Sequence, residues 1–375
     1  MGYCISSGPV STEVFSRFSG VYLQDGTVIS LPNELEGRYL GAGGSTSESG
    51  RSALRIQTRL NMSTGALQGP WVASSRESER NGAGSLEQAP LPPGSLFIHD
   101  SEYLTLGDLK KHQEAGTYMM SHARADAAIT DARGVKYQLK EFLLNRLKTH
   151  EQVDEWVTLG TRTSSQQRVR IIACRVSPEK EQERLESSGK KTKGRAKGSR
   201  GDTVVGKKHF PTARKTHRTK MSQARRELSG YLIIVTNVPE ELLKTHEVHI
   251  LLRSRWQIEL LWRLWKERGL IDLWRSEKPM RILCEVYAKL LGCIFQHWIL
   301  LKGCWQQPNR SLVKASQAIR PLIAAYLLSW SGPLTSGEIL GAMGRSMKRA
   351  QLNRRPVRLS TAQLLEEPSR KQALA

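Results

Sequence analysis

The chain has 375 residues, a hydrophobic content of 39% and a formal net charge of +22 at pH 7. This hydrophobic share excludes a wholly disordered chain, and the length suggests about two domains. The positive charge favours a polyanionic partner, either nucleic acid or an anionic membrane surface, and composition alone leaves a ribosomal or chromosome-coating protein open. The five cysteines form no Cys-x-x-Cys pair, which disfavours a structural zinc site or disulfide framework and fits a reducing compartment.

The first part of the chain is predicted to be rich in β-strands. Residues 20–32 are expected to form two short β-runs around a turn at Asp25-Gly26. Residues 52–60 alternate apolar and polar positions, and residues 61–65 can turn the chain into a further run that ends near Val72. The Ser-, Gly- and Pro-rich residues 74–95 are expected to form a loop with at most one short helix.

A compact apolar strand is expected at residues 96–98, followed by His99 and the acidic Asp100. Residues 104–115 are then predicted to form a helix that stops at Gly116, and residues 117–121 the next strand. Strands followed by a strand, a helix and a strand indicate the α/β class.

The middle of the chain changes in composition. Short β segments are expected at residues 138–147, 153–159 and 168–176. Residues 186–227 are poor in aliphatic side chains, and residues 190–226 carry 14 Lys and Arg against one acid, a net charge of +13. This stretch is either a solvated, disordered linker or an arm that faces nucleic acid, and the two interpretations are compatible.

The last third is predicted to be mainly helical. A buried strand at residues 231–235 and a turn at 236–239 lead into an amphipathic helix that ends near Arg268-Gly269, and two further helices are expected at 280–301 and 311–329. The most apolar stretch, residues 281–303, carries Glu285, Lys289 and His297, so it is predicted to be a core helix and too polar for a membrane span. The basic C-terminal end is expected to fray.

One charged stripe on the predicted helix draws attention. At about 100° per residue, Arg255, Glu259 and Lys266 fall on one narrow stripe beside an apolar face. A surface ladder of salt bridges is the plainer interpretation, because such stripes are usually solvated.

These residues resemble a known family, the bacterial insertion-sequence-four DDE transposases. Those proteins carry Tyr-x2-Arg-x3-Glu-x6-Lys on a helix, commonly within an Arg-Trp-Gln-Ile-Glu run. Here Arg255-x3-Glu259-x6-Lys266 has that spacing, residues 255–259 are that run, and Leu252 stands where the family has Tyr. In the family the Tyr, Arg and Lys contact the element end, so the Leu puts one DNA contact in doubt.

The resemblance implies two further carboxylates upstream. The first family Asp ends an early strand and is often followed by Gly-Thr, as Asp25-Gly26-Thr27 is here. The second follows the fourth strand and often precedes an aromatic residue, which matches Asp100 with Tyr103. Each match alone is weak, because an Asp at the end of a strand is usually a turn or cap residue.

The resemblance further implies a catalytic triad of Asp25, Asp100 and Glu259 that binds two Mg²⁺ ions, with Mn²⁺ as a substitute. Asp25 would bridge both ions, Asp100 would hold one and Glu259 the other. Two divalent ions about 3.5–4 Å apart activate the attacking oxygen and stabilise the leaving oxygen of a phosphodiester, and Mg²⁺ prefers carboxylate and water oxygens. The DNA contacts would come from basic and aromatic residues of the same region, namely Arg253, Arg255, Trp256 and Lys266.

The implied fold is α/β, with an RNase H-like catalytic core interrupted by a mostly β insertion and followed by C-terminal helices. The expected domains are residues 1–124 for the first part of the core, 125–228 for the insertion with its basic arm, 229–305 for the second part with the Glu helix, and 306–375 for a helical, basic C-terminal region. Trp156 is a candidate in the insertion for stacking on a flipped base, although a core Trp is the commoner case.

The expected partners are double-stranded DNA, as element ends and target, and a second copy of the chain when assembled on DNA; a membrane is not expected. The expected location is the bacterial cytoplasm at the nucleoid. Only 24 residues precede Asp25, where the family usually has a helical DNA-binding region, so a truncated copy is expected. The alternatives are an inactive transposase remnant, a non-catalytic basic DNA-binding protein, and a stand-alone RNase H-like nuclease that only hydrolyses.

Overall fold

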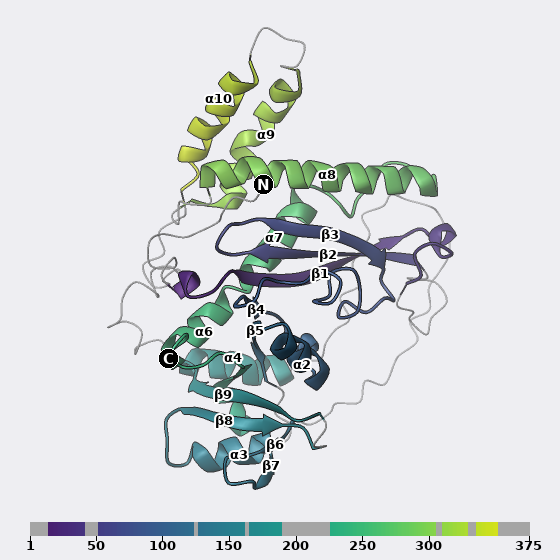
Figure 1. Ribbon diagram of the computed structural model, residues 1–375. Helices are drawn as coiled ribbons and strands as arrows, with labels where there is room; N and C mark the ends of the chain where they lie inside the picture. The colour runs from purple at the N-terminus through teal and green to yellow at the C-terminus, as the bar shows by residue number, and fades with distance from the viewer. Residues whose placement is uncertain are drawn as a thin grey trace.

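A computed structural model describes residues 14–41, 52–123, 127–161, 165–189, 226–304, 310–328 and 335–351. Ten strands in these ranges form one sheet in the order β3-β2-β1-β4-β5-β10-β9-β8-β6-β7, and helices cover both of its faces (Figure 1). The chain is therefore a mixed α/β protein, as the order of its predicted elements indicated.

The first half of the sheet contains the strands that precede the basic arm. They are β1 (Val21–Leu31), β2 (Ser52–Asn61), β3 (Leu67–Ser74), β4 (Leu96–Ile98) and β5 (Tyr118–His122). Strand β1 pairs antiparallel with β2 and parallel with β4, and β4 pairs parallel with β5. Because β1 and β4 are parallel, their carboxyl ends lie at the same edge of the sheet.

The second half of the sheet extends it beyond β5. It comprises β6 (Ala128–Thr130), β7 (Lys136–Gln138), β8 (Val153–Leu159), β9 (Gln167–Arg175) and β10 (Tyr231–Thr236). Strand β10 lies between β5 and β9 and is antiparallel to both. The strands of residues 127–175 thus continue the same hydrogen-bonded sheet through β10, which follows them in sequence.

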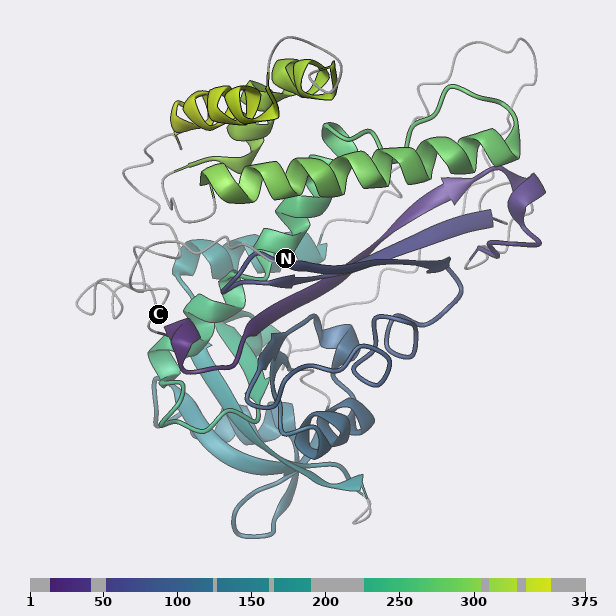
Figure 2. The ribbon, with the colours of Figure 1, turned by 45° about the horizontal axis from the view of Figure 1, so that its top comes forward.

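The helices pack on two opposite faces of the sheet. One face is buried under α6 (Thr245–Arg253), α7 (Trp256–Glu267) and α8 (Pro279–Cys304), and α9 (Leu312–Leu328) and α10 (Ser336–Lys348) pack outside α8 (Figures 1 and 2). The other face is buried under α2 (Leu106–Glu114) and α3 (Leu139–Arg146). Alternation along the strands explains both cores, since Met120 belongs to the first and Met119 to the second.

Several predicted elements are confirmed. Strands β2 to β5, β8, β9 and β10, and helices α2, α8 and α9, lie where the sequence predicted them. The turn between β2 and β3 is held by Asn61, whose side chain accepts hydrogen bonds from the backbone of Ser63 and Thr64, while Gly65 adopts φ +69°. Gly116, at φ +63°, ends α2 as expected.

The predicted turn at Asp25-Gly26 is wrong. Strand β1 passes through this dipeptide without interruption, and Asp25 and Gly26 pair with Thr58 and Gln57 of β2. Strand β2 supplies an unbroken set of partners, so the ladder offers no point at which the chain could reverse. The first carboxylate therefore lies in the middle of a strand.

The strand predicted at residues 138–147 is also wrong. Residues 139–146 form α3, whose buried side chains are Leu139, Phe142 and Leu143. These positions are spaced i, i+3 and i+4, which is the period of one helix face. The short apolar run was ambiguous, and its spacing, rather than its apolar content, decides the outcome.

The single long helix predicted before Arg268 is two helices. Helix α6 ends at Arg253 and α7 begins at Trp256. Between them the buried Ser254 donates its hydroxyl to the carbonyl of Leu251 at 2.5 Å. Such a back-bond competes with the helical hydrogen bonds and bends the chain, so α7 takes its own direction across the sheet.

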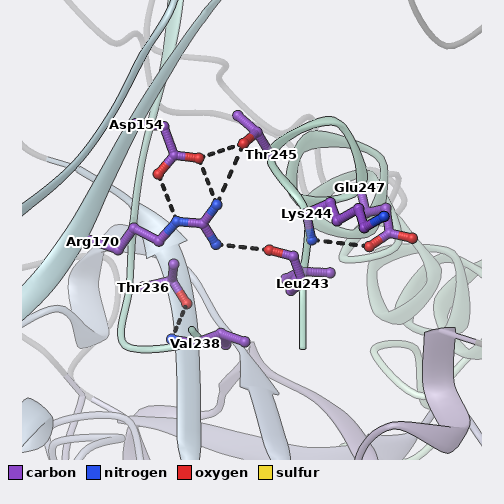
Figure 3. A network of polar contacts seen from close by, with 8 residues as sticks. All are labelled: Asp154, Arg170, Thr236, Val238, Leu243, Lys244, Thr245 and Glu247. Atoms are coloured by element: carbon purple, nitrogen blue, oxygen red, sulfur yellow. Dashed lines mark hydrogen bonds and ion pairs between the residues drawn. The ribbon is translucent and has the colours of Figure 1, made fainter. Parts of the chain in front are cut away.

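A buried ionic network joins the second half of the sheet to the start of α6 (Figure 3). Arg170 on β9 donates from Nε to Asp154 Oδ1 at 2.6 Å, and its Nη1 donates to the carbonyl of Leu243 at 2.7 Å. Thr245, the first residue of α6, donates its hydroxyl to the same Asp154. The Arg170 side chain is 1% exposed, so these partners satisfy a fully buried charge.

The basic stretch predicted as an arm lies mostly outside the described residues. Its described beginning is part of α4 (Pro178–Gly189), a helix that was not predicted and that starts with Pro at its first position. Helix α10 was likewise not predicted; it starts with a capping box in which Thr335 and Glu338 bond each other's backbone N–H.

Helix α8 departs from the expectation about membranes. By length and composition alone, its stretch Pro279–Leu301 is apolar enough to cross a bilayer, although 39% of the apolar window is buried in the protein. Its inner face, including Val286 and Leu290, belongs to the main core as predicted. Length and composition cannot separate a core helix from a membrane span in this case.

Candidate functional site

Asp25 points to the face of the sheet that α7 covers. Leu23 and Ile29, two and four residues away on β1, belong to the same core as Ile258 and Trp262 of α7. Since side chains alternate along a strand, Asp25 shares the face of Leu23, while Gly26 belongs to the opposite face. The Asp25 side chain is thus half-buried under the helix that carries Glu259.

Asp100 lies beside Asp25 at the edge where β1 and β4 end their pairing. Leu23 pairs with Ile98, so the parallel register continues to Asp25 and Asp100 two residues further along. Asp100 is the N-cap of the 3-10 turn η2 (Ser101–Tyr103), and its Oδ1 accepts the backbone N–H of Ser101 at 2.5 Å. This bond fixes one carboxylate oxygen and leaves Oδ2 to face α7.

Helix α7 completes the group with Glu259 and Arg255. The Arg255 guanidinium lies 2.6 Å from Glu259 Oε1 through Nη2 and 3.7 Å from Asp100 Oδ2 through Nη1. One guanidinium therefore contacts two carboxylates that are 159 positions apart in the chain. The i, i+4 pair predicted from helical spacing exists, and the fold brings it to the predicted second Asp.

The electrostatics show that Asp25 belongs to the same group. Burial raises the pKa of Asp25 to about 6, a hydrogen bond from the Gly26 backbone opposes that rise, and the charge of Glu79 adds to it. Arg255 lowers the same pKa and Glu259 raises it. All three predicted carboxylates thus lie within reach of Arg255, as they must to act on one substrate atom.

The chemistry of the site fits a divalent cation. Three carboxylates with hard oxygen donors surround a position that now holds the positive charge of Arg255, and the raised pKa of Asp25 reports a local excess of negative charge. Among the described residues no group of three His, Cys, Asp or Glu side chains is close enough to hold a metal ion in this arrangement. Asp100 and Glu259 would have to exchange Arg255 for a cation.

The other residues predicted to contact DNA surround this site unequally. Trp256, at the start of α7, is 47% exposed, and the Arg263 guanidinium lies 5.4 Å from its ring centroid. Lys266 lies in the last turn of α7, about 10 Å along the helix axis from Glu259 at 1.5 Å per residue. Arg253 belongs to α6, before the break, and its charge acts on His249.

Two further positions can be placed. Leu252, at the family's Tyr position, is 4% exposed and packs in the main core. Trp156, the candidate for base stacking, is half-buried on β8 with the Arg168 guanidinium 5.3 Å from its ring centroid. Neither of them has a contact with the three carboxylates among those described above.

Sequence reasoning missed Glu79. It lies in the loop after β3, ion-paired with Arg55 at 3.4 Å, and its hydroxyl donor is Tyr103. Loop carboxylates of this kind carry no spacing signal. The one available signal was Gly26, because a Gly in the interior of a strand often marks a close approach by another group.

Comparison with known proteins now identifies the family. The family model described as "Transposase DDE domain" matches residues 16–294. The chain is 26% identical over 298 residues to the transposase for insertion sequence element IS231F of Bacillus thuringiensis subsp. israelensis and 25% identical over 301 residues to that for IS231D of subsp. finitimus. It is 19% identical over 283 residues to the transposase for IS1151 of Clostridium perfringens.

Each of these alignments covers 76% of this chain and 57% of the relative, so the chain spans little more than half the length of the curated relatives it matches. The family model, in contrast, covers most of the chain and includes Asp25, Asp100 and Glu259. The chain belongs to the DDE transposase domain family.

Proposed function

We propose that this protein is a DNA transposase that cleaves and joins DNA strands at the ends of a mobile element with a triad of Asp25, Asp100 and Glu259. The observation that carries the proposal is the contact of Arg255 with both Asp100 and Glu259, beside Asp25. A surface salt-bridge ladder would have brought Arg255 only to its helix neighbour. Convergence with a distant strand end is what a catalytic group requires.

The strand order β3-β2-β1-β4-β5, with β1 antiparallel to β2 and parallel to β4, supports an RNase H-like core. Residues 127–189 would then be the predicted insertion, built onto the far side of β10. The proposed boundaries of the four domains follow from this assignment.

The family generally uses divalent metal ions, and Asp25, Asp100 and Glu259 are the residues that would hold two Mg²⁺ or Mn²⁺ ions here. Bound there, the ions would make the attacking oxygen more nucleophilic and stabilise the leaving oxygen. Asp25 and Asp100 approach from adjacent strand ends and Glu259 from the helix above them, so the carboxylates orient the reacting phosphodiester from two sides.

The basic residues would bind the DNA backbone. Arg255 would exchange its carboxylate partners for a phosphate, Lys266 and Arg253 would hold the strand further along, and Trp256 offers an exposed aromatic face. The net charge of +22 supplies the long-range attraction for double-stranded DNA. Joining two element ends to one target implies a homodimer on DNA, at the bacterial nucleoid.

A strand-cleavage assay tests the proposal. Duplexes that carry the ends of the flanking element would be incubated with Mg²⁺ or Mn²⁺ and wild-type protein, Glu259→Gln or Glu267→Gln. Glu267 is a matched control because it lies on the same helix and is exposed. Metal-dependent nicking that only Glu259→Gln abolishes is the expected result.

Other outcomes separate the alternatives. DNA binding without nicking by the wild type would favour an inactive remnant or a non-catalytic DNA-binding protein. Nicking without joining of the cleaved end to a target duplex would favour a stand-alone nuclease.

A further inference from the structure

A polar layer lies on the opposite face of β1 from Asp25, directly behind it. Gly26 faces this layer together with its cross-strand partner Gln57 on β2. A Cβ atom added at Gly26 would lie 2.7 Å from Oε1 of Glu79. The Glu79 carboxylate therefore lies against the backbone of β1, in space that only a glycine leaves open.

Three side chains from two other elements hold Glu79 there. Tyr103 of η2 donates its hydroxyl to Glu79 Oε2, and Arg55 of β2 lies 3.4 Å from Oε1. Gln57 donates from Nε2 both to the Tyr103 hydroxyl at 2.9 Å and to the Glu79 backbone carbonyl at 3.2 Å. Gln57 and Tyr103 are buried, so this arrangement is shielded from competing water.

Tyr103 connects this layer to the second carboxylate of the triad. It is the last residue of the short 3-10 turn η2, whose N-cap is Asp100, and the Tyr103 backbone N–H bonds the Asp100 carbonyl at 3.0 Å. The position of Tyr103 thus sets the position of the turn. Glu79 touches the strand of Asp25 on one side and the turn of Asp100 on the other.

We propose that Glu79 is a positioning residue of the transposase site, which fixes Asp100 beside Asp25 through its hydrogen bond with Tyr103. This inference rests on the proposed function, because it assigns Glu79 a role in the same metal-binding triad. Glu79 is not proposed as a ligand, since it occupies the face of β1 opposite Asp25.

The chemistry of the pair suits this role. Burial and the Glu79 charge raise the pKa of Tyr103 above its usual range, so its hydroxyl stays protonated and donates. A hydrogen bond to a charged acceptor is stronger than a neutral one. A short turn of three residues has few bonds of its own, and an external bond of this strength determines where its N-cap carboxylate points.

Titration with Mn²⁺, followed by the electron paramagnetic resonance signal of the free ion, tests the proposal without relying on activity. The variants are Glu79→Ala, Glu79→Gln, Tyr103→Phe and the control Glu77→Ala, in the full chain. Glu77 lies in the same loop and contacts only the exposed Ser74 backbone through its side chain. Far-ultraviolet circular dichroism and urea unfolding would establish that each variant is folded.

We expect Glu79→Ala and Tyr103→Phe to raise the Mn²⁺ dissociation constant about 10-fold, the lower end of the range for residues that orient metal ligands. Glu79→Gln should restore most of the affinity, because its amide oxygen still accepts the Tyr103 hydroxyl. Glu77→Ala should bind Mn²⁺ as the wild type does.

The result that overturns the inference alone is clear: wild type binds Mn²⁺, Glu259→Gln weakens that binding, and both Glu79→Ala and Tyr103→Phe leave it unchanged. Equal weakening by Glu79→Ala and Glu79→Gln would also overturn it, since charge and not the hydrogen bond would then be responsible. Absence of Mn²⁺ binding by the wild type would overturn the proposed function and this role together.

Discussion

Arg255 Nη2 lies 2.6 Å from Glu259 Oε1, and the same guanidinium reaches across to Asp100 Oδ2 at 3.7 Å. The cation therefore lies between two carboxylates proposed to hold metal ions. Because a metal ion and a guanidinium compete for the same oxygens, and a DNA phosphate competes with those oxygens for Arg255, metal and DNA binding should be coupled.

The first prediction concerns Arg255→Gln. Removing the competing cation should lower the Mn²⁺ dissociation constant without DNA about 3- to 10-fold, a coupling energy at the low end of the usual range. DNA affinity should fall, and the slope of its logarithm against that of salt concentration should decrease by about one. Arg268→Gln is the control, since Arg268 is exposed at the end of the same helix. Weaker Mn²⁺ binding by Arg255→Gln would show that the guanidinium supports the site instead of competing.

The second prediction is a pH dependence of stability in the absence of metal. The pKa of Asp25 is raised from 3.8 to about 6, so the folded state favours the protonated form; the resulting stabilisation is complete below pH 3.8 and lost as pH rises through about 6. Asp25→Asn should therefore raise the free energy of unfolding by about 1–3 kcal/mol above pH 6 and by little below pH 4. Urea unfolding between pH 4 and 8 measures this difference. A gain that did not depend on pH would argue against ionisation of Asp25 as its cause.

The third prediction concerns Gly26→Ala. The added Cβ would lie 2.7 Å from Glu79 Oε1, and the carboxylate cannot move aside without breaking its hydrogen bond with Tyr103. We expect a loss of about 1–3 kcal/mol in the free energy of unfolding, as for other overpacked sites. The same substitution in the Glu79→Ala background should cost much less, and a double-mutant cycle by urea unfolding tests this. Additive effects would mean that the collision is absent.

The fourth prediction concerns the buried pair in Figure 3. Asp154→Ala leaves the Arg170 charge buried with its Asp partner missing, and should cost about 3–5 kcal/mol. Glu155→Ala, one residue along β8, removes a half-exposed ion pair with Arg146 and should cost about 1 kcal/mol or less. Urea unfolding of both variants gives the comparison.

Combining Asp154→Ala with Arg170→Met should recover part of the loss, because no unpaired charge then remains. Since the network ends on the first residue of α6, Asp154→Ala should also weaken Mn²⁺ binding at the site that follows on α7. Equal losses for Asp154→Ala and Glu155→Ala would contradict the assigned burial of the network.

The sequence by itself determined the family, the α/β class and the three carboxylates as candidates. The Arg255-x3-Glu259-x6-Lys266 spacing lies within one helix, and most strands and helices follow from the alternation and periodicity of apolar residues. These are local properties, because the period of a helix or strand is set by its own backbone geometry.

Only the tertiary structure decided the remainder. The ladder with β2 drew Asp25-Gly26 into a strand, and the back-bond of Ser254 divided the helix before Glu259. The approach of Arg255 to Asp100, and of Glu79 to Gly26, joins residues far apart in the chain. No local period encodes such contacts, because they depend on which strand edge, loop and helix the packing of the whole sheet brings to the same place.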